Sequence, residues 1–96
     1  MIEKLKKVLE EDDGFVTKVR FLDGYDEEKL YELLRVLKDL ANEWKGKDYI
    51  PKVAVNLLID VIPALISSSY SYEGEEREKI NFAIDDISEA IRTCLS

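Results

Sequence analysis

Apolar residues recur at helical spacing along most of the chain. Residues 2–12 carry apolar side chains three or four positions apart, with lysines between them: Ile2, Leu5, Val8 and Leu9. Because side chains at this spacing share one face of an α-helix, the pattern predicts an amphipathic first helix. We expect the polar and glycine residues at 12–14 to end it.

The next segment, residues 15–22, fits two patterns. Phe15, Val19 and Leu22 suit a helix, whereas alternate residues from Phe15 to Phe21 suit one face of a strand. A solitary strand would leave its backbone groups unpaired. Asp13 is a good N-cap and Gly24 a good C-terminal stop. We therefore expect a short helix, with a strand as the alternative.

A clear amphipathic helix is predicted over residues 26–44. Asp26 can cap it, and Glu27 and Glu28 occupy its first turn, where the helix dipole favours negative charge. Glycine at 46 should stop it. Its apolar side chains form one stripe of the kind that faces a core: Leu30, Leu33, Leu34, Leu37, Leu40, Ala41 and Trp44.

The segment 51–67 is apolar on almost every side, which is typical of a central helix packed by several neighbours. Pro51 can stand in its first turn, and Pro63 should kink it between residues 59 and 63. The polar residues Asn56 and Asp60 are expected at its solvent edge. The most apolar run, residues 53–66, is shorter than the roughly 20 residues that cross a bilayer, so we expect a core segment and no membrane span.

Residues 67–74 are rich in serine and tyrosine and are predicted to be a loop. A last helix is expected from about residue 75 to 95, with one apolar stripe: Ile80, Ala83, Ile84, Ile87, Ile91, Cys94 and Leu95. A chain of 96 residues has room for one core. The prediction is a single all-α domain over 1–96, a compact bundle of four to five helices.

The composition narrows the range of functions. A formal net charge of −7 repels phosphate backbones and disfavours nucleic-acid binding. The single cysteine, Cys94, has no partner for an internal disulfide and lies on a predicted apolar stripe, so we expect a buried thiol in a reducing compartment. The start of the chain lacks the apolar stretch of a signal peptide, which favours a cytoplasmic location.

Catalytic chemistry has little support in the residues. The chain contains no histidine, which excludes Ser-His and Cys-His relays and histidine zinc sites. Its four glycines form no phosphate loop, and its serines lack the context of an acyl-carrier site. The acid pairs at 75–76 and 85–86 point about 100° apart on a helix and do not converge. We expect no enzyme activity, cofactor or metal.

One aromatic residue stands apart from the apolar stripe of the last helix. Phe82 lies about 150° from the middle of that stripe at 100° per residue. Its helical neighbours four before, three and four after, and seven on either side are acids: Glu78, Asp85, Asp86, Glu75 and Glu89. An aromatic anchor with a charged rim is how a protein-binding surface is built. The alternative is that Phe82 is covered by the amino-terminal segment or by a second copy.

The loop before this helix offers two further candidates, Tyr70 and Tyr72. Mixtures of serine and tyrosine are common in adaptable binding loops. Residues 73–89 carry seven acids and two bases, a field that attracts a basic partner and speeds its arrival. We therefore expect a basic protein to bind here.

In size, acidity, helical content and lack of catalytic groups, the chain resembles the bacterial immunity proteins, which neutralise toxins. The resemblance implies a protein that binds and blocks a basic toxin. The colicin-type members carry a paired-tyrosine segment followed by proline, and Ser69-Tyr70-Ser71-Tyr72 departs from that pattern. The alternative function is a homo-oligomeric structural or regulatory protein. The free protein is expected to be a monomer or homodimer.

Overall fold

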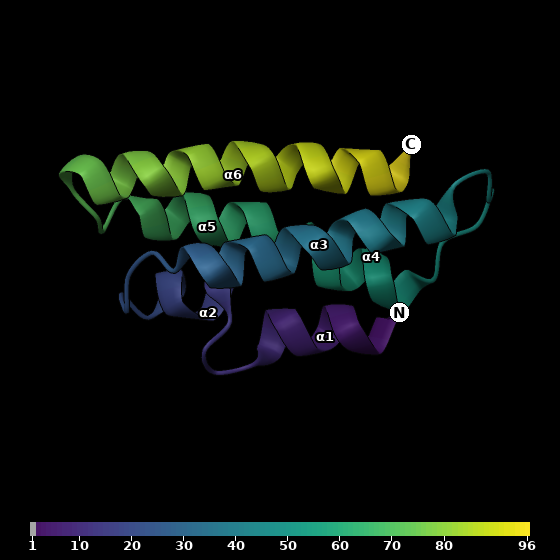
Figure 1. Cartoon of the computed structure of the whole chain (residues 1–96), viewed down its shortest axis with the longest axis horizontal. Helices are drawn as coiled ribbons and strands as arrows, with labels where there is room; N and C mark the ends of the chain where they lie inside the picture. Colours follow the sequence, from purple (N-terminus) through teal and green to yellow (C-terminus); the bar gives the residue numbers. More distant parts are fainter. Residues whose placement is uncertain (1) are drawn as a thin grey trace.

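The two longest helices, α3 (Glu27–Trp44) and α6 (Gly74–Leu95), lie side by side along the long axis of the molecule (Figure 1). The computed structural model describes residues 2–96, and all regular structure in that range is helical. The predicted all-α bundle is therefore confirmed, with principal extents of 41 × 23 × 20 Å.

Four shorter helices complete the bundle. α1 (Ile2–Glu10) and α2 (Phe15–Arg20) both contact α3. α4 (Lys52–Ile59) packs against α1, and α5 (Val61–Ser69) packs between α2 and α6. The chain thus forms one layer of two long helices, and the short pairs α1–α2 and α4–α5 cover it and close the core.

Residues 15–20 of the ambiguous segment form a helix, because this conformation buries their apolar side chains on one face. Phe15, Val16 and Val19 are buried at three- and four-residue spacing. The expectation of Asp13 as N-cap is wrong: the N-cap residue is Gly14, and no side chain caps the helix. A Cβ at Gly14 would lie 2.6 Å from the carbonyl oxygen of Val8, so the close approach of α1 requires glycine.

The end of α2 also differs from the prediction. Gly24 is not the stop; the helix ends at Arg20, and Leu22 takes a left-handed conformation with φ of 62°. The amide of Asp23 donates to the carbonyl of Lys18 at 2.8 Å, and that of Leu22 donates to Val19 at 3.3 Å. These two bonds form a Schellman motif in which leucine occupies the usual glycine position.

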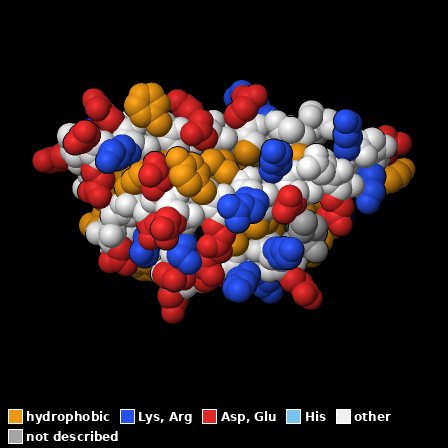
Figure 2. All heavy atoms as spheres, viewed as in Figure 1, with side chains coloured by type: hydrophobic (Ala, Val, Ile, Leu, Met, Phe, Trp, Pro, Cys, Tyr) orange, Lys and Arg blue, Asp and Glu red, His pale blue; other side chains and the backbone are white. Residues whose placement is uncertain are grey.

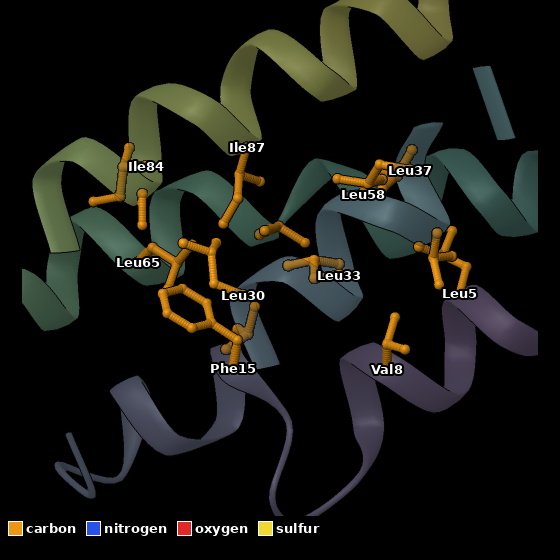
Figure 3. Packing of buried hydrophobic residues seen from close by; sticks show 14 of the residues in the cluster. Leu5, Val8, Phe15, Leu30, Leu33, Leu37, Leu58, Leu65, Ile84 and Ile87 are labelled. Atoms are coloured by element: carbon orange, nitrogen blue, oxygen red, sulfur yellow. The ribbon is translucent and has the colours of Figure 1, made fainter. Parts of the chain in front are cut away.

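Helix α3 follows the predicted pattern closely. The side chain of Asp26 accepts a hydrogen bond from the backbone amide of Lys29 at 3.2 Å, which confirms it as the N-cap. The apolar stripe lies in the core, and Val36 is buried with it. Figure 3 shows Leu30 of α3 meeting Phe15 of α2 and Leu65 of α5 in the packed interior.

The predicted kink between 59 and 63 is a break at Asp60 that divides the segment into α4 and α5. Pro63 has no amide proton to donate to Ile59, whereas Ala64 donates to Asp60 at 3.1 Å. Asn56 and Asp60 are exposed, as expected. The expectation of burial on nearly all sides is wrong, because three large apolar side chains face outward: Val53, Ile59 and Ile66.

By length and composition alone, residues 52–69 could cross a membrane, with a mean hydropathy of 1.5. Only 28% of these residues are buried in the bundle. The segment therefore carries more apolar surface than packing within one copy of the chain buries.

Candidate protein-binding surface on helix α6

Helix α6 holds Phe82 away from the core because its opposite face is fully committed to packing. That face is buried against α3 and α5: Ile80, Ala83, Ile84, Ile87 and Cys94. The Cys94 thiol donates a hydrogen bond to the Leu37 carbonyl at 3.0 Å, and burial raises the pKa of the thiol. Phe82 is 70% exposed, so neither the amino-terminal segment nor any other part of residues 2–96 covers it.

The five expected acids around Phe82 are all exposed: Glu75, Glu78, Asp85, Asp86 and Glu89. Figure 2 shows acidic side chains gathered along the edge formed by α6, with exposed hydrophobic side chains among them. We call Phe82 and these five acids the α6 patch. An open depression beside Phe82 is bordered by Glu78, Asn81 and Asp85.

The carboxylates of the α6 patch form few ion pairs within residues 2–96. Among residues 2–96, its one ion pair joins Glu89 to Arg92 at 3.9 Å, and both side chains are about three quarters exposed. Such exposed pairs contribute little. The carboxylates are therefore available to cations on another molecule.

Tyr70 precedes α6 in the chain and is 70% exposed. The guanidinium carbon of Arg77 stands 5.0 Å from the centre of its ring, a cation–π arrangement that covers one ring face. Arg77 lies about 140° around α6 from Phe82 at 100° per residue, so the structure does not bring Tyr70 onto the α6 patch.

Tyr72 does not lie on the surface, which corrects its assignment to a contact loop. Its side chain is 6% exposed, and its hydroxyl donates to the Val19 carbonyl at 3.0 Å and accepts from the Gly24 amide at 3.2 Å. Burial raises its pKa. The serine-tyrosine loop is also shorter than expected, because α5 continues to Ser69.

The structure adds a residue that the pattern along α6 could not reveal. Tyr31 of α3 is 56% exposed, and its hydroxyl lies 3.3 Å from a carboxylate oxygen of Glu27. The charge of Glu27, and to a smaller extent that of Asp86, raises the pKa of Tyr31. Tyr31 thus extends the aromatic surface across the seam between α3 and α6. The sequence carried one signal for its exposure: Tyr31 does not fall on the stripe of leucines by which α3 faces the core.

Two further contacts fix the neighbouring end of α6. A carboxylate oxygen of Glu76 accepts from the Tyr25 amide at 3.3 Å, and the Lys79 ammonium lies 5.9 Å from the centre of the Tyr25 ring. Glu76 is therefore partly engaged within the chain. Within residues 2–96, no three acidic or cysteine side chains are grouped to hold a metal ion.

No family model matches the chain, and neither a curated protein nor a solved structure does.

Proposed function

We propose that this protein is a cytoplasmic inhibitor that binds a basic protein through the α6 patch. The observation that carries the proposal is the exposure of Phe82, 70%, at the centre of five exposed carboxylates. Phe82 is the anchor that enters an apolar pocket of the partner. The acids select a partner with lysine and arginine around that pocket, and Tyr31 adds contact area at the edge formed by α3.

Aromatic anchors dominate the energetics of many interfaces because they bury a large apolar area in one place. The surrounding charges act mainly on the rate of encounter and on specificity, and their effect falls as salt rises. The proposal therefore requires a complex whose association rate falls steeply with salt concentration.

Inhibition follows from where such a surface would bind. A basic protein that acts on nucleic acid or another anionic substrate needs its cationic site open, and an acidic helix seated on that site blocks it. An immunity protein that neutralises a toxin is the specific form of this function that we propose.

The α6 patch is poorly suited to binding a second copy of itself. Two copies meeting on this surface would bring five carboxylates against five others, and like charges facing one another weaken an interface. The charge pattern therefore favours a basic partner over self-association at this surface.

The test is capture of partners from lysate of the protein's own source, with salt-gradient elution and identification by mass spectrometry. The expected result is one stoichiometric basic protein, bound by the wild type and lost with Phe82→Ala/Asp86→Lys. Binding of the captured protein is then measured with both forms.

Tyr49→Ala/Asp48→Lys is the matched control. It removes another exposed aromatic, 88% exposed, and reverses a neighbouring acid in the loop between α3 and α4. This control should retain the partner. Equal binding by wild type and by the Phe82→Ala/Asp86→Lys variant, with both folded, would remove the α6 patch from the interface.

A further inference from the structure

The exposed side chains of α4 are arranged symmetrically about Asn56, and packing within the chain does not explain this arrangement. Ala54 and Leu58 are buried, and the exposed side chains lie on the opposite side of the helix, centred on Asn56. Val53 and Ile59 stand three residues before and after Asn56 and are 56% and 65% exposed. Lys52 and Asp60 stand four residues before and after it, and both are exposed.

These exposed residues form two rows that cross at Asn56. One row follows the i±3 direction and is apolar on both sides of the amide: Val53, Asn56 and Ile59. The other follows the i±4 direction and carries opposite charges at its ends: Lys52, Asn56 and Asp60. Asp60 has helical dihedral angles, φ −93° and ψ −8°, so it keeps the register of the helix.

We propose that a second copy of this chain occupies this face, with a twofold axis running along the row Val53–Asn56–Ile59. A closed twofold contact needs a surface that is complementary to itself. About this axis each residue of the apolar row meets its own copy. The charged row crosses the axis, so Lys52 of each copy meets Asp60 of the other.

A twofold axis along the i±3 row makes the i±3 rows of the two copies coincide. Because these rows lie at about 45° to the helix axis, the two α4 helices then cross nearly at right angles. Lys52 and Asp60 are about 12 Å apart along one helix at 1.5 Å per residue, so they do not pair with each other. The ion pairs found within residues 2–96 involve neither of them. Asn56 can donate to and accept from its copy at the crossing point.

The chemistry of this face excludes the basic partner proposed for α6. Residues 52–69 contain one base and one acid, so the face is neutral in a chain of net charge −7. It offers a basic protein no attraction, and it is a place where two acidic molecules can meet without facing their carboxylates. It also lies on a different helix from the α6 patch, so a second copy and the basic partner do not compete for the same residues.

The dimer is weak because the contact covers only two turns of helix. Stable interfaces bury about 800 Å² on each partner, more than α4 alone provides. We therefore expect a dissociation constant between about 10 μM and about 1 mM, the range of weak complexes. Dimerisation is visible only when concentration is varied across that range.

The test is sedimentation velocity of the full chain over this range of concentration, on the wild type and charge variants. Asp60→Lys places two lysines together at both symmetric positions and should raise the dissociation constant at least about tenfold. Lys52→Asp should do the same with two acids. The double variant Lys52→Asp/Asp60→Lys restores both pairs and should return the constant to within about threefold of wild type.

Controls separate this effect from net charge and from folding. Asp12→Lys and Lys38→Asp change exposed residues outside the face by the same charge and should leave the dissociation constant unchanged. Ile59→Asp should abolish the dimer while thermal unfolding stays that of the monomer. Lys52→Asp also replaces a base in the first turn of α4, where an acid is favoured, so it should weaken the dimer without destabilising the fold.

A wild type that stays monomeric across the range overturns the proposal, and sedimentation with neutral phospholipid vesicles would then assign the face to a lipid surface. Single variants that weaken the dimer without rescue by the double variant overturn the proposed twofold axis. Phe82→Ala should not alter dimerisation, so loss of the basic partner and loss of the dimer are distinguishable.

Discussion

The hydroxyl of Tyr72 donates a hydrogen bond to the backbone carbonyl of Val19, 53 residues earlier in the chain, at 3.0 Å. The same oxygen accepts from the Gly24 amide at 3.2 Å. One phenol thus joins the turn after α2 to the turn before α6. It gives the Gly24 amide an acceptor and gives the Val19 carbonyl a second donor besides the Leu22 amide.

Tyr72→Phe should destabilise the fold by about 1–3 kcal/mol, because it leaves the Gly24 amide without its acceptor and the Val19 carbonyl without this donor. Urea unfolding followed by circular dichroism measures the change. Tyr70→Phe is the control, since Tyr70 is 70% exposed, and should remain within about 0.5 kcal/mol of wild type. Equal effects of the two changes would contradict the buried role of Tyr72.

Leu22→Gly should stabilise the protein, by about 0.5–1 kcal/mol. A left-handed conformation costs a leucine about 1–2 kcal/mol, and glycine avoids that cost while losing more chain entropy on folding. Leu22 is 59% exposed, so little packing is lost. Thermal unfolding compares Leu22→Gly with Leu22→Val, whose branched side chain should be worse than leucine. A destabilised glycine variant would show that Leu22 packs more firmly than its exposure indicates.

Phe82→Ala should change the free energy of unfolding by no more than about 0.5 kcal/mol, as expected of a surface substitution. Phe15→Ala is the contrast, because Phe15 is 1% exposed and its loss should cost about 3–5 kcal/mol. Chemical denaturation measures both variants. A cost for Phe82→Ala that approaches the cost for Phe15→Ala would place Phe82 in a core and remove it from any binding surface.

Stability should fall in acid partly because of Asp26. A hydrogen bond from Lys18, at 2.9 Å, and then one from the Lys29 amide lower the pKa of this carboxyl. Since its folded pKa is below the unfolded value of about 3.9, Asp26 stabilises the fold above that value. The contribution disappears as pH falls through the lower folded pKa.

Asp26→Asn should therefore flatten the dependence of stability on pH below about 5, as measured by thermal unfolding over a pH series. Lys18→Met should flatten it in the same direction, because Lys18 is the largest cause of the shift. An unchanged slope in both variants would show that other carboxyls govern the acid transition.

Local patterns predicted the helices well where one face is plainly apolar. The stripe from Leu30 to Trp44 and the cap at Asp26 follow from residue spacing and side-chain chemistry within a single turn. The outward position of Phe82 follows from the same periodicity. Pro63 marked the break because a missing amide proton is a local property.

The misplaced features depend on how segments of the chain pack against one another. Gly14 is the N-cap of α2, and the Val8 carbonyl lies where a Cβ at residue 14 would be. Residue spacing does not show how closely the turn after α1 folds back. Tyr72 is buried because Val19 and Gly24 supply its hydrogen-bond partners. Whether a tyrosine faces solvent or a backbone amide is decided by packing, since its ring and hydroxyl suit both environments.

The sequence by itself determined the helical architecture, the acidic character of the last helix and the exposed aromatic within it, because helical periodicity fixes which side chains share a face. Only the tertiary structure decided which apolar surface is buried within one molecule and which stays exposed. The segment 52–69 is apolar nearly all round, so its pattern cannot say which side faces the core. The packing of α1, α2 and α6 against it buries Ala54, Leu58 and Leu65, and leaves Val53 and Ile59 outward.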